Sequence, residues 1–219
     1  MKTGKTIVAA SILSADFGRM ADEIAVMENS GVDVIHCDVM DGIFVPNITF
    51  GFKMISDIKK RTSLPLDVHL MIDRPSRYVE KFIDSGADWL TVHYEAGEDP
   101  RGALEAIKKR GIKSGLSISP DTDTSVVGDY IELCDLVLLM SVYPGFGGQK
   151  FILRSLERMR ALKKIRERAG VSALLSIDGG VNEQNAKEIM DAGADVLVVG
   201  NTLFSAKAPR EIVSKFHNL

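Results

Sequence analysis

Eight short apolar runs, each of strand length, alternate with longer amphipathic stretches from one end of the chain to the other. The apolar runs lie at residues 7–13, 33–40, 66–72, 89–94, 113–119, 135–142, 173–178 and 195–200. Helical patterns follow many of them, among them residues 51–61, 76–85, 101–110, 153–169, 183–192 and 208–217. Because parallel neighbouring strands need a crossover connection, this alternation predicts a parallel sheet covered by helices. Eight strands can close into a barrel, and a chain of 219 residues is long enough for one.

We therefore predict a single (β/α)8 TIM barrel domain over residues 1–219. A short motif recurs where a helix should end and an even-numbered strand should begin. Residues 30–33, 85–88 and 192–195 each contain Gly and, two residues later, Asp, and Asp135 takes the same place without the glycine. Glycine suits the left-handed residue that ends a helix. The motif is consistent with a repeated βαβα unit.

Composition narrows the classes of partner. A formal net charge of −3 and a pI of about 5.8 argue against general affinity for nucleic acid or for an anionic membrane. The two cysteines have no paired spacing, which favours a reducing cytoplasm. The N-terminal sequence MKTGKT and the apolar run 7–13 lack a secretory cleavage site, and the run is too short to span a membrane. We expect a cytoplasmic homo-oligomer.

Polar side chains occupy the ends of three predicted strands, where barrel enzymes carry their chemistry. Strand residues two apart share a face, so His36 and Asp38 point the same way on the second strand. His69 is placed similarly on the third strand, and Asp178 ends the seventh. Two imidazoles and two carboxylates suit a divalent ion such as Zn²⁺, Fe²⁺, Mn²⁺ or Co²⁺. Spacing alone leaves two interpretations open, a metal site or hydrogen-bonded residues at strand ends.

Glycine-rich loops follow the sixth, seventh and eighth predicted strands. Glycine lets backbone N–H groups converge on an anion, and barrel enzymes often bind phosphate in this part of the chain. The pattern favours phosphate binding over ordinary turns. The candidate residues are Gly145, Gly147, Gly148, Gly179, Gly180, Gly200 and Asn201.

Other candidate residues lie on neighbouring strands. Met40, Met71 and Met140 fall near the ends of the second, third and sixth strands, where methionine is most simply core filling. Beside a metal site they would form an apolar wall that excludes water. Ser11, on the first strand, could reach a substrate hydroxyl group.

Several stretches together resemble the ribulose-phosphate 3-epimerase family. The likeness runs in order over nearly the whole chain, and the long motif at residues 36–47 is its most specific part. The matching stretches are residues 11–17 (SILSADF), 36–47 (HCDVMDGIFVPN), 66–71 (LDVHLM), 144–151 (PGFGGQKF), 178–180 (DGG) and 199–200 (VG), with Phe204.

The resemblance implies roles for these residues. His36, Asp38, His69 and Asp178 would bind one divalent metal, and Asp38 and Asp178 would be the two acid–base groups. The other positions would contact substrate: Ser11, His69, Met40, Met71, Met140, Gly145, Gly147, Gly148, Gly179, Gly180, Gly200 and Asn201.

The implied reaction inverts C3 of a phosphorylated ketose, converting D-ribulose 5-phosphate to D-xylulose 5-phosphate. Inversion next to a carbonyl needs one group to remove a proton and a second to return one on the opposite face. Asp38 and Asp178, on different parts of the barrel wall, would do this through a metal-stabilised enediolate.

The sequence departs from the usual family pattern at Tyr143, Ser119, Ser176 and Asn201. These positions lie around the substrate end, so D-allulose 6-phosphate remains an alternative substrate. A metal-dependent barrel hydrolase, a metal-free phosphate-binding barrel and a non-catalytic sugar-phosphate binder are further alternatives. His93 is the one later histidine near a strand end that could extend a hydrolase site.

Overall fold

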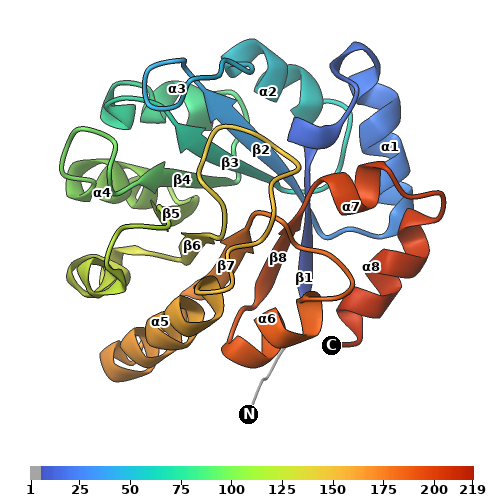
Figure 1. The fold of residues 1–219 in the computed structure, drawn as a ribbon. Helices are drawn as coiled ribbons and strands as arrows, with labels where there is room; N and C mark the ends of the chain where they lie inside the picture. The colour runs from blue at the N-terminus through green and yellow to red at the C-terminus, as the bar shows by residue number, and fades with distance from the viewer. Residues whose placement is uncertain (1–5) are drawn as a thin grey trace.

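Each predicted apolar run contains one strand of a closed parallel barrel (Figure 1). The computed structural model describes residues 6–219, and β1 pairs with both β2 and β8, which closes the sheet. The strands are β1 Ile7–Ser11, β2 Val34–Met40, β3 Leu66–Met71, β4 Trp89–His93, β5 Lys113–Ile118, β6 Leu136–Met140, β7 Leu174–Asp178 and β8 Val196–Val199. The predicted barrel is confirmed.

Helices form the outer ring around this sheet (Figure 1). They are α1 Met20–Ser30, α2 Phe52–Lys59, α3 Val79–Asp84, α4 Arg101–Lys109, α5 Ser155–Ala169, α6 Ala186–Ala192, α7 Asn201–Phe204 and α8 Pro209–His217. Between β5 and β6 the cover consists of two 3₁₀ helices, Thr124–Asp129 and Ile131–Leu133.

Both faces of the strands are buried, as their nearly continuous apolar sequences predict. Residues such as Ile35, Cys37 and Val39 on β2 pack outward against the helices and are at most 4% exposed. Alternate residues point into the barrel, where Val34, Leu138 and Val198 belong to a second apolar cluster. Above this cluster the inward positions turn polar, and this change creates the site described below.

In the repeated Gly and Asp motif, the Asp before each even-numbered strand is hydrogen-bonded to the odd-numbered strand that precedes it. Gly31 and Gly193 end α1 and α6 with positive φ values of 87° and 117°. Each motif Asp accepts a backbone N–H of the preceding strand through its Oδ2 atom. These pairs are Asp33 with Val8, Asp88 with Leu66, Asp135 with Ser114 and Asp195 with Leu175. Two of these carboxylates also pair with side-chain cations, Asp88 with Lys59 and Asp195 with Arg166.

The described residues form one domain, and residues 1–5, at the start of the N-terminal stretch considered for a leader, lie outside them. Cys37 and Cys134 are both free and buried. Among residues 6–219, no helix is long and apolar enough to cross a membrane. The expected cytoplasmic location and homo-oligomeric state stay predictions.

Replacing Asp195 with Ala should lower the free energy of unfolding by about 1–3 kcal/mol, because the Leu175 N–H loses its acceptor and the half-buried Arg166 guanidinium loses its carboxylate partner. Asp191→Ala is the matched control, since Asp191 contacts only Lys187 in an exposed pair and its loss should cost less than about 0.5 kcal/mol. Urea unfolding measures both. Equal losses would show that the hydrogen bond between the Leu175 N–H and Asp195 adds no more to the free energy of unfolding than an exposed ion pair does.

Candidate active site

A cavity of about 310 Å³ opens at the carboxyl ends of the strands. Asp38 on β2 and Asp178 on β7 both line it, together with Met40, Met71 and Met140. These side chains reach the cavity because alternate strand residues point into the barrel. The cavity therefore combines two carboxylates with an apolar methionine wall.

Four predicted residues meet at the floor of this cavity. One ligand atom from each of His36, Asp38, His69 and Asp178 lies within 4.8 Å of those of the other three. The pairing of β2 with β3 brings Asp38 directly opposite His69, and Asp178 stands at the end of β7. Strands far apart in the sequence thus bring together the donors that the sequence analysis selected.

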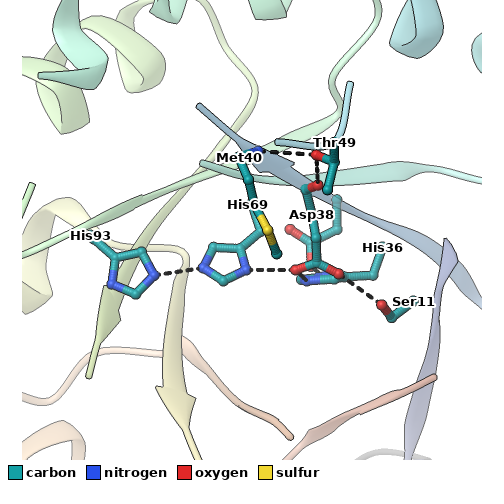
Figure 2. A network of polar contacts seen from close by, with 8 residues as sticks. Ser11, His36, Asp38, Met40, Thr49, His69 and His93 are labelled. Carbon is teal, nitrogen blue, oxygen red and sulfur yellow. Dashed lines mark hydrogen bonds and ion pairs between the residues drawn. The ribbon is translucent and has the colours of Figure 1, made fainter. Parts of the chain in front are cut away.

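Asp38 is the most connected member of this cluster (Figure 2). The Ser11 hydroxyl donates to its Oδ2 at 2.7 Å. His36 Nε2 and His69 Nδ1 lie 3.2 and 3.1 Å from its Oδ1. The Thr49 hydroxyl donates to its backbone carbonyl at 2.7 Å, which fixes the end of β2. Asp38 is 2% exposed, so its carboxylate is held by protein groups rather than by bulk water.

Both histidines are fully buried beneath the cavity, and each has a second hydrogen-bonding partner. His36 Nδ1 lies 2.7 Å from Asp67 Oδ2, and His69 Nε2 lies 2.8 Å from His93 Nε2. Asp67 was absent from the predicted site, although it stands two residues before His69 and shares its face. The predicted contact of His69 with substrate stays a prediction, because His69 lies below the residues that line the cavity.

The two carboxyl groups differ in pKa. Burial alone would raise the pKa of Asp38, but the charge of His36 and the hydrogen bonds from His36 and His69 hold it below its usual range. Burial, reinforced by the charge of Asp38, raises the pKa of Asp178 to about 7. Asp178 sits at the partly exposed rim, yet protein atoms surround its carboxyl group. At neutral pH Asp38 is therefore a carboxylate, while Asp178 is protonated in a large fraction of the molecules.

The two histidines also have pKa values shifted in opposite directions. Burial would lower the pKa of His36, but Asp38 and Asp67 on either side raise it well above its usual value. Burial lowers the pKa of His69 to about 4, so this ring is neutral. Two imidazole nitrogens and two carboxylate oxygens within one 4.8 Å cluster are donors that fit a borderline divalent transition metal.

The predicted glycines line the cavity, as does Asn201. Gly180 has φ +66°, and a Cβ there would lie 2.5 Å from the backbone N of Phe151. Gly179 has φ +118°, and a Cβ there would clash with the Val142 side chain. Only glycine permits this close approach of the loops after β6 and β7.

The loop after β6 reaches across the barrel mouth toward the loop after β2, as the yellow segment in Figure 1 shows. The Asn47 side chain donates to the Gly145 carbonyl at 2.8 Å. Within the loop, the Gln149 amide donates to the carbonyls of Tyr143 and Phe146. The Tyr143 hydroxyl lies 3.0 Å from an Asp121 oxygen. Tyr143, one of the residues that differ from the usual family pattern, thus connects this loop to the loop after β5.

Comparison with known proteins gives a consistent result. The model of the ribulose-phosphate 3 epimerase family matches residues 7–204. A ribulose-phosphate 3-epimerase of Aquifex aeolicus is 48% identical, covering 92% of this chain and 90% of that protein. One of Bacillus subtilis is 44% identical over 95% of this chain and 96% of that protein.

Similar solved structures share the fold at low identity. A 3-hexulose-6-phosphate synthase superposes with a TM-score of 0.69 at 18% identity, over 97% of this chain and 98% of the other. The tryptophan synthase α-subunit of Pyrococcus furiosus gives a TM-score of 0.71 at 14% identity, over 98% of both chains. At this identity the likeness speaks for the barrel fold alone.

Asp38→Asn should lower the pKa of Asp178 in metal-free protein, because the amide removes a negative charge that favours the protonated carboxyl. The pKa should stay above the ordinary aspartate value, since burial is the larger cause. Carboxyl ¹³C NMR over pH 4–9 measures it. Asp191→Asn, on the exposed face of α6, should leave it unchanged. An unaltered Asp178 titration in Asp38→Asn would contradict the coupling.

Proposed function

Since the chain belongs to the ribulose-phosphate 3-epimerase family, and is thus an isomerase, we propose that it interconverts D-ribulose 5-phosphate and D-xylulose 5-phosphate. One observation carries the proposal: two carboxyl groups with opposite pKa shifts line one cavity. An acid and a base kept in different protonation states are what inversion at C3 requires.

Asp38 and Asp178 act as the two proton-transfer groups in this proposal. Asp38, a carboxylate that accepts the Ser11 hydroxyl, removes the C3 proton from one face of the ketose. Asp178, carrying a proton on its carboxyl group, returns one to the opposite face. The reverse reaction exchanges these roles. Met40, Met71 and Met140 keep water away from C3 while it is planar.

The cluster of His36, Asp38, His69 and Asp178 would hold a divalent cation, whose identity the donor set leaves open among Zn²⁺, Fe²⁺, Mn²⁺ and Co²⁺. A bound cation would supply a Lewis acid that offsets negative charge on the substrate oxygens. His69, neutral at physiological pH, is ready to donate its lone pair, whereas His36 must first lose a proton.

The glycine-rich side of the cavity binds the substrate phosphate in this proposal. Gly147, Gly148, Gly179, Gly180 and Gly200 offer backbone close to the ligand space without side chains in the way. Binding energy from the phosphate would orient C3 between the two carboxyl groups. The matched relatives are named ribulose-phosphate 3-epimerases, which favours the five-carbon ketose over the six-carbon alternative.

Cation removal should abolish epimerisation, and adding back Zn²⁺, Fe²⁺, Mn²⁺ or Co²⁺ should restore it. Binding should release at least one proton at pH 7, because the pKa of His36 is raised well above its usual value and this ring must lose a proton before it can donate a lone pair to the cation. The affinity should therefore rise between pH 6 and pH 8. Calorimetry in buffers of different ionisation enthalpy measures the protons. An affinity indifferent to pH would contradict these protonation states.

Asp38→Asn and Asp178→Asn should each reduce turnover on the order of 10³-fold or more, because each removes one proton-transfer group. Starting from D-ribulose 5-phosphate in deuterated water, Asp178→Asn should still exchange the C3 hydrogen without forming D-xylulose 5-phosphate. Asp38→Asn should do neither.

NMR of the sugar products distinguishes these outcomes, and metal analysis of both variants controls for cation loss. D-allulose 6-phosphate, assayed in parallel, should be the poorer substrate. Turnover within tenfold of the wild type in either variant would overturn the two-base assignment. Hydrolytic products without C3 exchange would favour the hydrolase alternative.

A further inference from the structure

A line of buried hydrogen bonds runs from the active-site cluster into the loop after β4. It begins at His69, whose Nε2 lies 2.8 Å from His93 Nε2 (Figure 2). It continues to Glu95, whose Oε2 lies 3.0 Å from His93 Nδ1. The His69 and His93 side chains are both fully buried. Neither His93 nor Glu95 lines the cavity, so both act through another residue if they act on the reaction at all.

The direction of each hydrogen bond follows from the carboxylate at the end of the line. Glu95 can only accept, so His93 Nδ1 must carry the proton and donate it. When Nδ1 carries the only proton of the His93 ring, Nε2 has a lone pair and accepts the proton of His69 Nε2. When a cation occupies the place between His69 Nδ1 and Asp38 Oδ1, which lie 3.1 Å apart in the metal-free structure, a His69 protonated at Nε2 offers its Nδ1 lone pair to that cation. The carboxylate thus selects the tautomer two rings away.

Packing holds the two rings in place for this selection. The His69 and His93 rings stack with centroids 5.0 Å apart and an interplanar angle of 25°. Phe44, from the loop after β2, lies against His93 with a centroid distance of 4.8 Å. A half-turn of the His93 ring would keep the stacking but put carbon atoms in place of both hydrogen-bonding nitrogens, so the hydrogen bonds select one of the two orientations that packing allows.

Glu95 is itself fixed at its other oxygen. The Ser119 backbone N–H donates to Oε1 at 2.8 Å, and the Thr122 hydroxyl donates to the same atom. Arg158 on α5 donates to the backbone carbonyls of both Ser119 and Thr122, which holds this loop in position. Burial would raise the pKa of Glu95, but the hydrogen bonds lower it to about 2, so it stays a carboxylate at physiological pH.

We propose that Glu95 and His93 are positioning residues that hold His69 with Nδ1 unprotonated and directed at the cation site. The inference rests on the proposed metal site. His36 has the direct version of the same device, a carboxylate, Asp67, 2.7 Å from its Nδ1. Carboxylates that orient a histidine ligand commonly influence metal affinity by 10- to 100-fold. At His69 the carboxylate acts through one intervening ring.

The first test measures the dissociation constant of Co²⁺ by competition with a chelating dye. Glu95→Gln should weaken binding by about 10- to 100-fold, because an amide NH₂ group must then face either His93 Nδ1–H or the Ser119 and Thr122 donors. Glu98→Gln is the matched control. It removes the same charge three residues away, where Glu98 accepts only from Ser76, and should bind Co²⁺ as the wild type does.

A second measurement needs no variant. Long-range ¹H–¹⁵N NMR of the wild-type protein with Zn²⁺ bound should show His93 protonated at Nδ1 and His69 protonated at Nε2. A His93 ring protonated at Nε2 would overturn the inference, whatever the folding behaviour of Glu95→Gln.

The outcomes separate this inference from the proposed function. A wild-type protein that binds none of the four ions overturns the metal site, and the inference with it. A wild-type protein that binds Co²⁺ tightly while folded Glu95→Gln binds within twofold overturns the inference alone. Weaker binding in Glu95→Gln together with unchanged binding in Glu98→Gln supports it.

Discussion

The register of β2 against β3 is the constraint on which the site depends. Pairing Asp38 with His69 and His36 with Asp67 puts four polar side chains on the inner face of two adjacent strands. A shift of either strand by one residue would turn its two polar side chains toward the helices, since side chains alternate along a strand. The apolar residues between them, such as Cys37 and Val68, secure this register because they fill the layer between sheet and helices.

Burying charges inside a barrel is unfavourable unless each charge has a partner. This structure meets that condition by arranging the polar groups in connected lines. Asp38 accepts from Ser11 and two histidines, and each histidine leads to a further carboxylate, Asp67 or Glu95. The Asp178 carboxyl group accepts no comparable set of hydrogen bonds from the described side chains, and burial raises its pKa. The difference between the two aspartates thus comes from the same packing that makes the cluster.

The residues predicted for the site and the side-chain cluster in the structure overlap where the periodicity of the strands indicates which side chains share a face. His36, Asp38 and His69 could be selected because alternation and strand ends predict which side chains meet at the barrel mouth. Asp67 shares the face of His69 and could have been found by the same rule. Glu95 could not, because it lies beyond β4 in a loop where no periodic pattern applies. The 3₁₀ cover between β5 and β6 was likewise missed, since that segment has no helical periodicity.

By itself, the sequence determined the barrel and the residue types at its mouth, because the apolar periodicity and the order of the segments can be read directly along the chain. Only the tertiary structure decided which atoms lie within hydrogen-bonding distance, which oxygen of Asp38 faces which ring and how far each pKa moves. Those quantities depend on separations of a few tenths of an ångström between strands that lie up to 140 residues apart, as Asp38 and Asp178 do. Closure of the sheet sets these separations, and no local pattern records them.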